Sequence, residues 1–146
     1  MNGLSTAYNT AVDDLITRIL SESHTVAIVG LSPDPERDSY EVAAYLQAHG
    51  YRIIPVNPNA AEILGERSYA DLRSIPERID LVDVFRRPAA TPEIAEAAVA
   101  IGAKALWLQI DIVNDQAAVI ARAGGVDVVM DRCTMIEHRE RFGPRL

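Results

Sequence analysis

The stretch Thr25-Val26-Ala27-Ile28-Val29-Gly30-Leu31 decides the fold. It is an almost uninterrupted apolar run, and four similar runs follow it at residues 52–57, 79–85, 105–110 and 126–130. Runs that are nearly continuous in Val, Ile and Leu are typical of strands covered on both faces, and such strands form largely parallel sheets. The five runs therefore predict a five-stranded parallel sheet between two layers of helices.

Helical patterns separate these runs. Residues 38–49 place Val42, Tyr45 and Leu46 on one face before Gly50, and Asp38 followed by Glu41 suggests a capping box at the start. Similar patterns occupy residues 92–100 and 114–123. We also expect an opening helix near residues 4–20 and a closing helix after Cys133. The long connection over residues 59–77 is predicted to be irregular, with one short helical turn near Leu72 and Ile75.

Strands that alternate with helices predict an α/β fold with a doubly wound, Rossmann-like sheet of three layers. Right-handed crossovers then bring all strand-to-helix loops to the carboxyl edge of the sheet, where ligands bind in such folds. At 146 residues the chain is expected to form a single domain, residues 1–146.

Composition narrows the function classes. Hydrophobic residues make up 49% and charged residues 24%, a balance typical of globular proteins. The stretch 1–23 carries Asp13, Asp14 and Glu22, so we interpret it as neither a secretory signal nor a membrane span and expect a cytoplasmic protein. The formal net charge of −7 argues against binding to nucleic acid or to anionic membranes. A single cysteine excludes an internal disulfide and a cysteine-based metal cage.

The loop after the first strand, residues 30–40, bears on cofactor choice. It contains only Gly30, whereas the dinucleotide fingerprint GxGxxG needs three glycines. Asn57-Pro58 also stands where an acidic residue would hold the ribose of NAD, so a nicotinamide cofactor is disfavoured. Gly30, with the hydroxyls of Ser32 and Ser39 before a helix N-terminus, remains suitable for a phosphate. The alternative is that Gly30 and the loop prolines only shape a turn.

Four arginines strengthen the phosphate hypothesis. Arg37 lies in the first loop, Arg86 and Arg87 end the third strand, and Arg132 ends the fifth. We expect all four at one edge, where guanidinium groups match a polyphosphate. The alternative is that some of them pair with Asp83, Asp111 or Asp131.

No catalytic or metal constellation is visible. His24 is expected at the opposite edge of the sheet, His49 at a helix end and His138 in the tail, and no pair has zinc-site spacing. Cys133 follows the last strand near the expected pocket. It is interpreted either as a small buried hydrophobe or as a thiol near the ligand, with Arg132 lowering and Asp131 raising its pKa.

Five ordered blocks resemble the CoA-binding domain family of small stand-alone proteins, which is similar in fold to the nucleotide-binding domain of the succinyl-CoA synthetase α subunit. The blocks are residues 26–32 (VAIVGLS), 50–58 (GYRIIPVNP), 82–88 (VDVFRRP), 102–109 (GAKALWLQ), and 129–133 (VMDRC) with 136–138 (IEH). Two positions depart from the pattern: Asp111 stands where glycine is expected, and Ala60 stands where the synthetase has a lysine that contacts adenine. The chain also lacks the synthetase's second domain, so ligase activity by this chain alone is not expected.

The resemblance implies CoA at the carboxyl edge, with pyrophosphate near residues 30–32 and further contacts from residues 85–88 and 108–110. Together with the residues above, the expected cofactor-binding set is Gly30, Leu31, Ser32, Arg37, Ser39, Tyr40, Asn57, Pro58, Phe85, Arg86, Arg87, Pro88, Leu108, Gln109, Ile110, Arg132 and Cys133. Tyr40 and Phe85 are offered as adenine contacts or as core residues.

Three functions stay open on the sequence. The leading one is a non-enzymatic module that binds CoA or an acyl-CoA as a carrier, sensor or regulatory partner. The second is an NAD(P)-binding or acyl-CoA-processing subunit that is active only with a partner chain. The third is an interaction protein with an empty pocket. Because no acid, base and nucleophile converge, the first is favoured over the second.

Overall fold

The computed structural model describes residues 3–143 and contains the predicted sheet. Its five strands are β1 (Thr25–Val29), β2 (Arg52–Val56), β5 (Leu81–Val84), β6 (Ala105–Leu108) and β7 (Asp127–Val129). They are all parallel and lie in the order β2-β1-β5-β6-β7, with Val26 paired to Ile53 on one side and to Leu81 on the other. Chain order reverses between β1 and β5, and in doubly wound sheets this switch point is where ligands bind.

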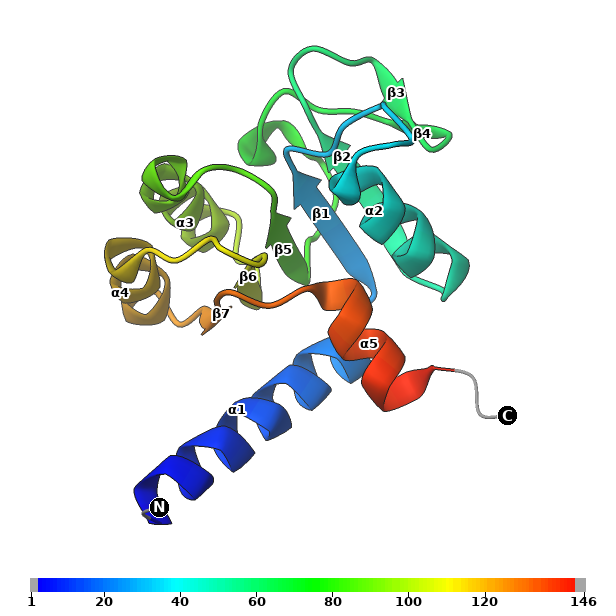
Figure 1. The fold of residues 1–146 in the computed structure, drawn as a ribbon. Helices are drawn as coiled ribbons and strands as arrows, with labels where there is room; N and C mark the ends of the chain where they lie inside the picture. Colours follow the sequence, from blue (N-terminus) through cyan, green and yellow to red (C-terminus); the bar gives the residue numbers. More distant parts are fainter. Residues whose placement is uncertain (1–2, 144–146) are drawn as a thin grey trace.

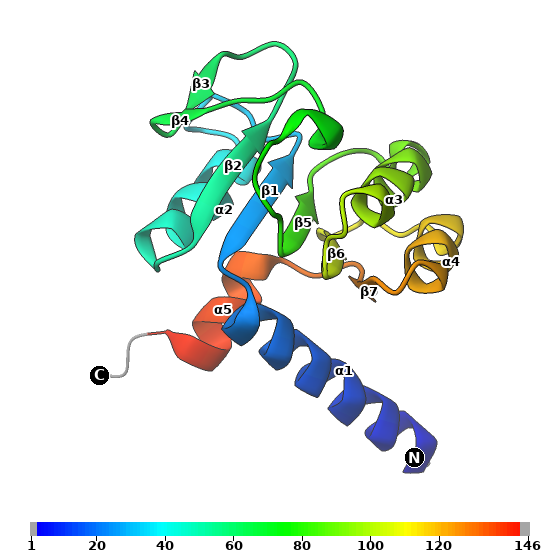
Figure 2. The same ribbon diagram turned by 180° about the vertical axis from the view of Figure 1, so that it is seen from behind.

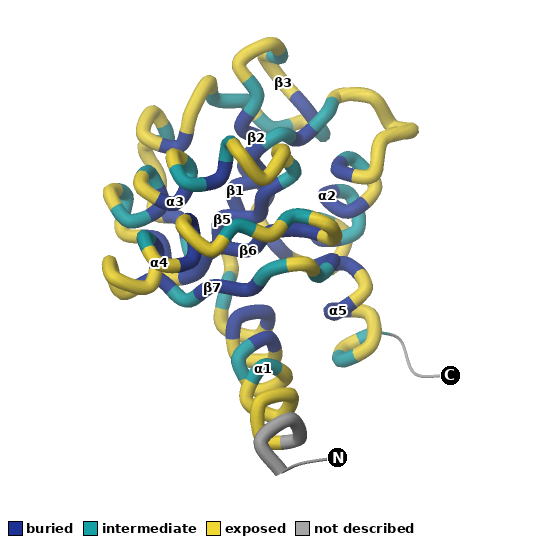
Figure 3. Tube along the Cα trace, turned by 60° about the vertical axis from the view of Figure 1, so that its left-hand side comes forward, coloured by how far each residue is buried: buried dark blue, intermediate teal, exposed yellow. Residues whose placement is uncertain are grey.

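Helices cover both faces of the sheet, as Figures 1 and 2 show. One face carries α1 (Gly3–Glu22), α2 (Asp38–Ala48) and α5 (Thr134–Phe142), and the other carries α3 (Thr91–Ala100) and α4 (Asp115–Ala123). The N-terminal part of α1 extends away from the sheet, and its exposed surface is visible in Figure 3. The predicted three-layer, doubly wound fold is confirmed.

Two cores follow from the alternation of side chains along each strand. In β1, Val26 and Ile28 face the side of α1, α2 and α5, whereas Ala27 and Val29 face α3 and α4. Trp107 is fully buried in the first core. Because both faces are covered, every residue of β1 and β5 is buried, which explains why these strands are apolar apart from Thr25 and Asp83.

The ends of two helices test the predicted capping. Asn114 caps α4 by accepting a hydrogen bond from the backbone N–H of Ala117 at 2.8 Å, and Gly50 follows α2 with φ of +95°. The expected capping box at Asp38 is wrong: Arg37 is the cap residue of α2, and no side chain bonds to the helix end there. Asp38 lies instead in the first helical turn, where a carboxylate still interacts favourably with the helix dipole.

The connection between β2 and β5 is more ordered than predicted. It forms a hairpin of β3 (Glu62–Ile63) and β4 (Glu66–Arg67), turned at Leu64 and Gly65, both of which have positive φ. The expected helical turn near Leu72 is present as the 3₁₀ helix η1 (Leu72–Ser74), and a second one, η2 (Pro88–Ala90), precedes α3. None of the helices within residues 3–143 is long and apolar enough to cross a membrane.

Candidate functional site

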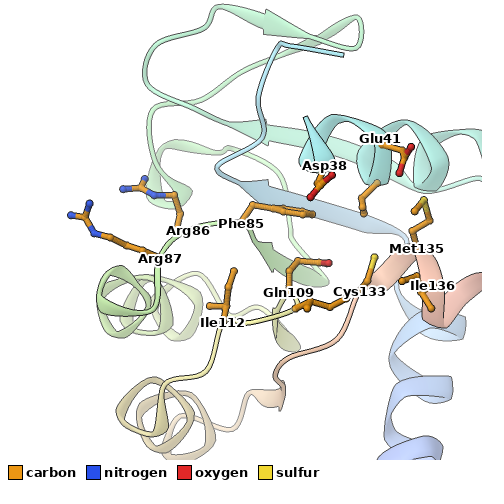
Figure 4. A pocket seen from close by; sticks show the side chains of 12 residues that line it. Asp38, Glu41, Phe85, Arg86, Arg87, Gln109, Ile112, Cys133, Met135 and Ile136 are labelled. Atoms are coloured by element: carbon orange, nitrogen blue, oxygen red, sulfur yellow. The ribbon is translucent and has the colours of Figure 1, made fainter. Parts of the chain in front are cut away.

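A cavity of about 470 Å³ opens at the carboxyl edge of β5 and β6, on the sheet face covered by α2 and α5 (Figure 4). Its middle is apolar, while arginines lie at one end and two carboxylates at the other. Its walls are formed by Asp38, Glu41, Val42, Phe85, Arg86, Arg87, Gln109, Ile110, Ile112, Cys133, Met135 and Ile136. The cavity thus lies at the carboxyl edge of the sheet, beside the switch point between β1 and β5, and its apolar middle adjoins two arginines.

Arg86 and Arg87 supply that cationic entrance. Both are exposed, directly after β5, and neither forms an ion pair among residues 3–143. Figure 4 shows their guanidinium groups directed away from the acidic side chains of Asp38 and Glu41. Unpaired guanidinium groups beside an apolar cavity are suited to phosphate groups, which they bind in a bidentate manner.

The other two predicted arginines lie elsewhere. Arg37 borders a neighbouring cavity of about 450 Å³ and lies 3.8 Å from the Asp34 carboxylate. The expectation that Arg132 joins the same group is wrong: it lines a separate groove of about 420 Å³ beside α1 and pairs with Glu137 at 3.5 Å. The residue before it, Asp131, has φ of +61° and forms a bend, so the chain does not continue in the direction of β7.

The loop after β1 mainly satisfies its own backbone. The Ser32 N–H donates to the Ser39 hydroxyl at 3.0 Å, and the Ser32 hydroxyl accepts from the Asp34 N–H at 3.0 Å. Gly30 has φ of +88°, and a Cβ there would lie within 2.4 Å of the Phe85 carbonyl oxygen. Gly30 is therefore needed for the close approach of the β1 and β5 ends. The adjacent cavity is also lined by three carboxylates, those of Asp34, Glu36 and Asp38.

Several predicted contacts belong to the fold. Leu31 and Leu108 are fully buried in the two cores, and Tyr40 packs against the first core. The Asn57 amide donates to the Leu31 carbonyl at 2.9 Å, so it ties the loops after β1 and β2 together. Pro88 accepts hydrogen bonds through its carbonyl from the Thr91 hydroxyl at 2.7 Å and the Asn114 amide at 3.0 Å.

Pro58 borders a smaller cavity of about 220 Å³ on the α3 face of the sheet. Arg86 lines this cavity as well as the larger one. A ligand with its phosphates at Arg86 would thus reach apolar space on either side of the β5 end.

Asp111 is exposed and has φ of +68°, a conformation that glycine adopts without strain. Its N–H donates to the Asp131 carboxylate at 2.7 Å. Its neighbours Ile110 and Ile112 line the large cavity, whereas Asp111 is not part of the wall.

The sequence analysis missed the wall contributed by α5. Cys133, predicted near the pocket, does line the cavity, and Met135 and Ile136 join it from the first turn of α5. Cys133 is also buried, with 8% of its surface exposed. Burial raises the pKa of the Cys133 thiol, and the charge of Asp83 raises it further. The electrostatic influences therefore come from Asp83 and Arg139 instead of Asp131 and Arg132.

A buried polar network lies beneath the cavity floor. Asp83, in the middle of β5, is fully buried between Ile28 and Trp107 of the adjacent strands. Its carboxyl accepts hydrogen bonds from the Gln109 amide at 2.6 Å and from the Thr134 hydroxyl at 2.9 Å. Burial raises the pKa of Asp83 to about 7, although these hydrogen bonds act in the lowering direction. The sequence signal for this network is a single acid in an apolar run, and within residues 3–143 this acid does not pair with an arginine.

His49 lies at the end of α2 as expected and His138 lies in the closing helix α5, but the contact between them was not predicted. His49 and His138 are brought together between α2 and α5, with ring centroids 5.2 Å apart, and the Tyr45 hydroxyl lies 2.9 Å from Nδ1 of His138. Burial and the nearby His49 lower the pKa of His138. The cluster is packed with Tyr51 and Phe142, so it joins the two helices. No group of three metal-ligating side chains is found in the part of the chain that the structure describes.

The model of the CoA binding domain family matches residues 24–139, which include the whole sheet and the cavity wall. The chain belongs to the CoA-binding domain family. It is 40% identical over 123 residues to the uncharacterized protein YneT of Bacillus subtilis, covering 84% of this chain and 91% of that protein.

Solved structures agree with this membership. The structure of Prb, the PH1109 protein redesigned for binding, has a TM-score of 0.89 at 40% identity and covers 92% of this chain and 94% of its own. A hypothetical protein from Pyrococcus horikoshii has a TM-score of 0.85 at 41% identity, covering 88% and 90%. The expected Rossmann-like fold of the CoA-binding domain family is confirmed.

A more distant similarity reaches ligases that contain this domain. The chain is 35% identical over 57 residues to the α subunit of the ADP-forming acetate–CoA ligase II of Pyrococcus furiosus, a match to 38% of this chain and 12% of the subunit. The dinucleotide-forming acetyl-coenzyme A synthetase 1 of Ca. Korarchaeum cryptofilum shares the fold at 20% identity, with a TM-score of 0.69 over 27% of its length. The segment that matches this chain is therefore only a small part of these enzymes.

Proposed function

We propose that the chain binds CoA at the carboxyl edge of its sheet, as a binding or regulatory module without catalysis of its own. The observation that carries this proposal is the apolar cavity beside β5 with the unpaired Arg86 and Arg87 at its mouth, in a member of the CoA-binding domain family. The phosphate groups lie against these arginines, and the pantetheine arm extends between Phe85 and α5 toward Gln109 and Cys133.

Electrostatics favour an orientation with the phosphate groups at the two arginines and the pantetheine arm inside the cavity. The chain carries a net charge of −7, so an anionic ligand needs a local cationic group. Asp38 and Glu41 border the cavity away from the arginines and would repel phosphate there. The uncharged pantetheine arm suits the intervening apolar wall. A volume of about 470 Å³ is within the range of small-molecule sites and accommodates this arm.

A second candidate is a subunit of an acyl-CoA-processing assembly. The similarity to the ligase α subunit supports it, but the matched segment is 12% of that subunit. A role of this kind needs a partner chain. The NAD(P) alternative is weakened because the Asn57 side chain, at the position expected for an acid, is engaged with the Leu31 carbonyl and the Asn59 N–H.

The test is a comparison of melting temperatures with CoA, NAD and NADP at equal concentrations. A ligand that binds only the folded state stabilises it by mass action, so we expect CoA to raise the melting temperature and both nicotinamide nucleotides to leave it unchanged. A larger shift with NAD or NADP would contradict the proposal. Native mass spectrometry of the purified protein would identify a ligand that is retained from the cell.

A further inference from the structure

Gln109 presents a fixed hydrogen-bond acceptor to the cavity. Its side-chain nitrogen donates to the Asp83 carboxyl at 2.6 Å and to the Thr134 hydroxyl at 3.0 Å. Asp83 and Thr134 are fully buried, and Gln109 is 4% exposed, so this arrangement is part of the packed interior. Both N–H bonds of the amide group are thereby used on the side away from the ligand.

The orientation of the amide follows from its partners. An ionised carboxyl group only accepts hydrogen bonds, so Asp83 requires the nitrogen of Gln109 and not its oxygen. When Asp83 holds a proton, that proton can lie between the carboxyl and the Thr134 oxygen, 2.9 Å away, and the carboxyl oxygen facing Gln109 remains an acceptor. The amide orientation is therefore compatible with both protonation states.

The Gln109 oxygen is left without a partner. Among residues 3–143 no group donates a hydrogen bond to it, and since no fully buried side-chain nitrogen or oxygen of these residues lacks a partner, the oxygen is accessible from the cavity that Gln109 lines. Figure 4 shows this oxygen directed into the space between Phe85 and Cys133. The surrounding side chains of Val42, Met135 and Ile136 offer no donor, and the Cys133 thiol is only a weak one. A nearly buried acceptor in apolar surroundings favours a ligand that brings a donor to it.

We propose that Gln109 makes the site selective for the free thiol of CoA over its thioesters, with Asp83 and Thr134 as positioning residues. This inference rests on the proposed function. The S–H group at the end of the pantetheine arm can donate to the Gln109 oxygen. A thioester has no proton at that sulfur and adds a carbonyl oxygen. The Gln109 oxygen then faces another hydrogen-bond acceptor and gains no bond.

The first experiment measures the affinities of CoA, desulfo-CoA and acetyl-CoA for the wild-type protein by titration calorimetry at pH 8. We expect CoA to bind about threefold to tenfold more tightly than either analogue, the range of one net hydrogen bond. This comparison needs no variant. If all three bind equally, the selectivity is absent although CoA binding stands. If none binds, the proposed function fails as well.

The second experiment repeats the titrations with Gln109→Met, which removes the acceptor while keeping side-chain length. CoA and desulfo-CoA should then bind equally, because the coupling between the thiol and the amide is lost. Gln116→Met is the matched control, since Gln116 is exposed on α4 and remote from the cavity wall. A preference for CoA that survives in Gln109→Met would overturn the assignment.

A third variant tests the positioning role. The Asn side chain in Asp83→Asn can donate as well as accept, so it allows the Gln109 amide to adopt either orientation. The preference for CoA over acetyl-CoA should fall to less than half its wild-type value, with acetyl-CoA binding more tightly than before. A purely structural defect would weaken both ligands and leave their ratio unchanged. An unchanged ratio in a folded protein, checked by circular dichroism, would exclude the positioning role.

Discussion

The ends of β1 and β5 meet at the same edge of the sheet, but they differ in charge and in what their side chains contact. The β1 end is an apolar strand followed by a glycine turn, in which Ser32 and Ser39 satisfy the loop itself and the exposed charges are mainly acidic. The β5 end carries the buried acid Asp83 and then Phe85, Arg86 and Arg87, which face the cavity or its mouth. The unpaired cationic side chains at this edge therefore follow β5, whereas the loop after β1 is mainly acidic.

The largest expected effect lies inside β5 and concerns pH. Folded Asp83 has a pKa of about 7 against an ordinary value of 3.8. Between these values the folded chain keeps a proton that the unfolded chain releases, so stability falls as pH rises through this window and is constant above it. Across this window the contribution of Asp83 to the free energy of unfolding changes by about 4 kcal/mol. This pH dependence should be absent in Asp83→Asn.

Urea denaturation of wild type and Asp83→Asn between pH 4 and 8 provides the measurement. The stability difference between the two proteins should change in favour of the variant as pH rises to about 7. Since all other titrating groups are common to both proteins, the difference isolates Asp83. Parallel curves would show that the pKa of Asp83 in the folded protein is ordinary.

The next effect concerns the arginines after β5. Arg86→Ala combined with Arg87→Ala should weaken CoA binding by about 1–3 kcal/mol, the range for lost hydrogen bonds to a charged group. The fold should remain intact because both side chains are exposed. Titration calorimetry with CoA gives the loss directly.

Arg132→Ala is the matched control for this pair. It removes one arginine from a strand end, but that arginine lies beside α1 and pairs with Glu137. Its effect on CoA affinity should be less than about 0.5 kcal/mol, as for surface substitutions away from a site. If Arg132→Ala weakened CoA binding as much as the double variant, Arg132 would belong to the same arginine cluster as Arg86 and Arg87.

A smaller effect is expected at the β1 end. The Ser32 hydroxyl accepts a hydrogen bond from the Asp34 N–H, and both groups are at the surface, where water can replace the bond. Ser32→Ala should therefore change CoA affinity by less than about 0.5 kcal/mol. A loss comparable to that of the arginine pair, measured in the same titrations, would transfer the phosphate contacts to the β1 loop.

The sequence predicted the sheet well because each strand is buried on both faces and reads as an apolar run. It predicted Phe85, Arg86, Arg87 and Cys133 at one edge because parallel strands end together, whereas Gln109 followed only from the resemblance to the CoA-binding domain family. It could not predict the direction of Arg132, which depends on the left-handed backbone at Asp131, nor the pairing of His49 with His138 across two helices. The hairpin turn at Leu64 was missed because a leucine seldom adopts positive φ.

The smallest effect concerns Cys133, where the cavity meets the core. The thiol lines the cavity, yet only 8% of the residue is exposed and burial raises its pKa. The thiolate is the reactive form, so we expect slow labelling by iodoacetamide at pH 7.5 and no mixed disulfide on brief incubation with CoA disulfide.

Bound CoA should slow the labelling further by covering the cavity, and the Arg86→Ala, Arg87→Ala variant should lose this protection at the same CoA concentration. Intact-mass measurement over time checks both points, with Cys133→Ser as the blank. Rapid formation of an adduct that adds the mass of CoA and disappears on reduction would show instead that the pantetheine thiol reaches an accessible, reactive Cys133. Protection that persists without the two arginines would place the bound phosphates away from the β5 end.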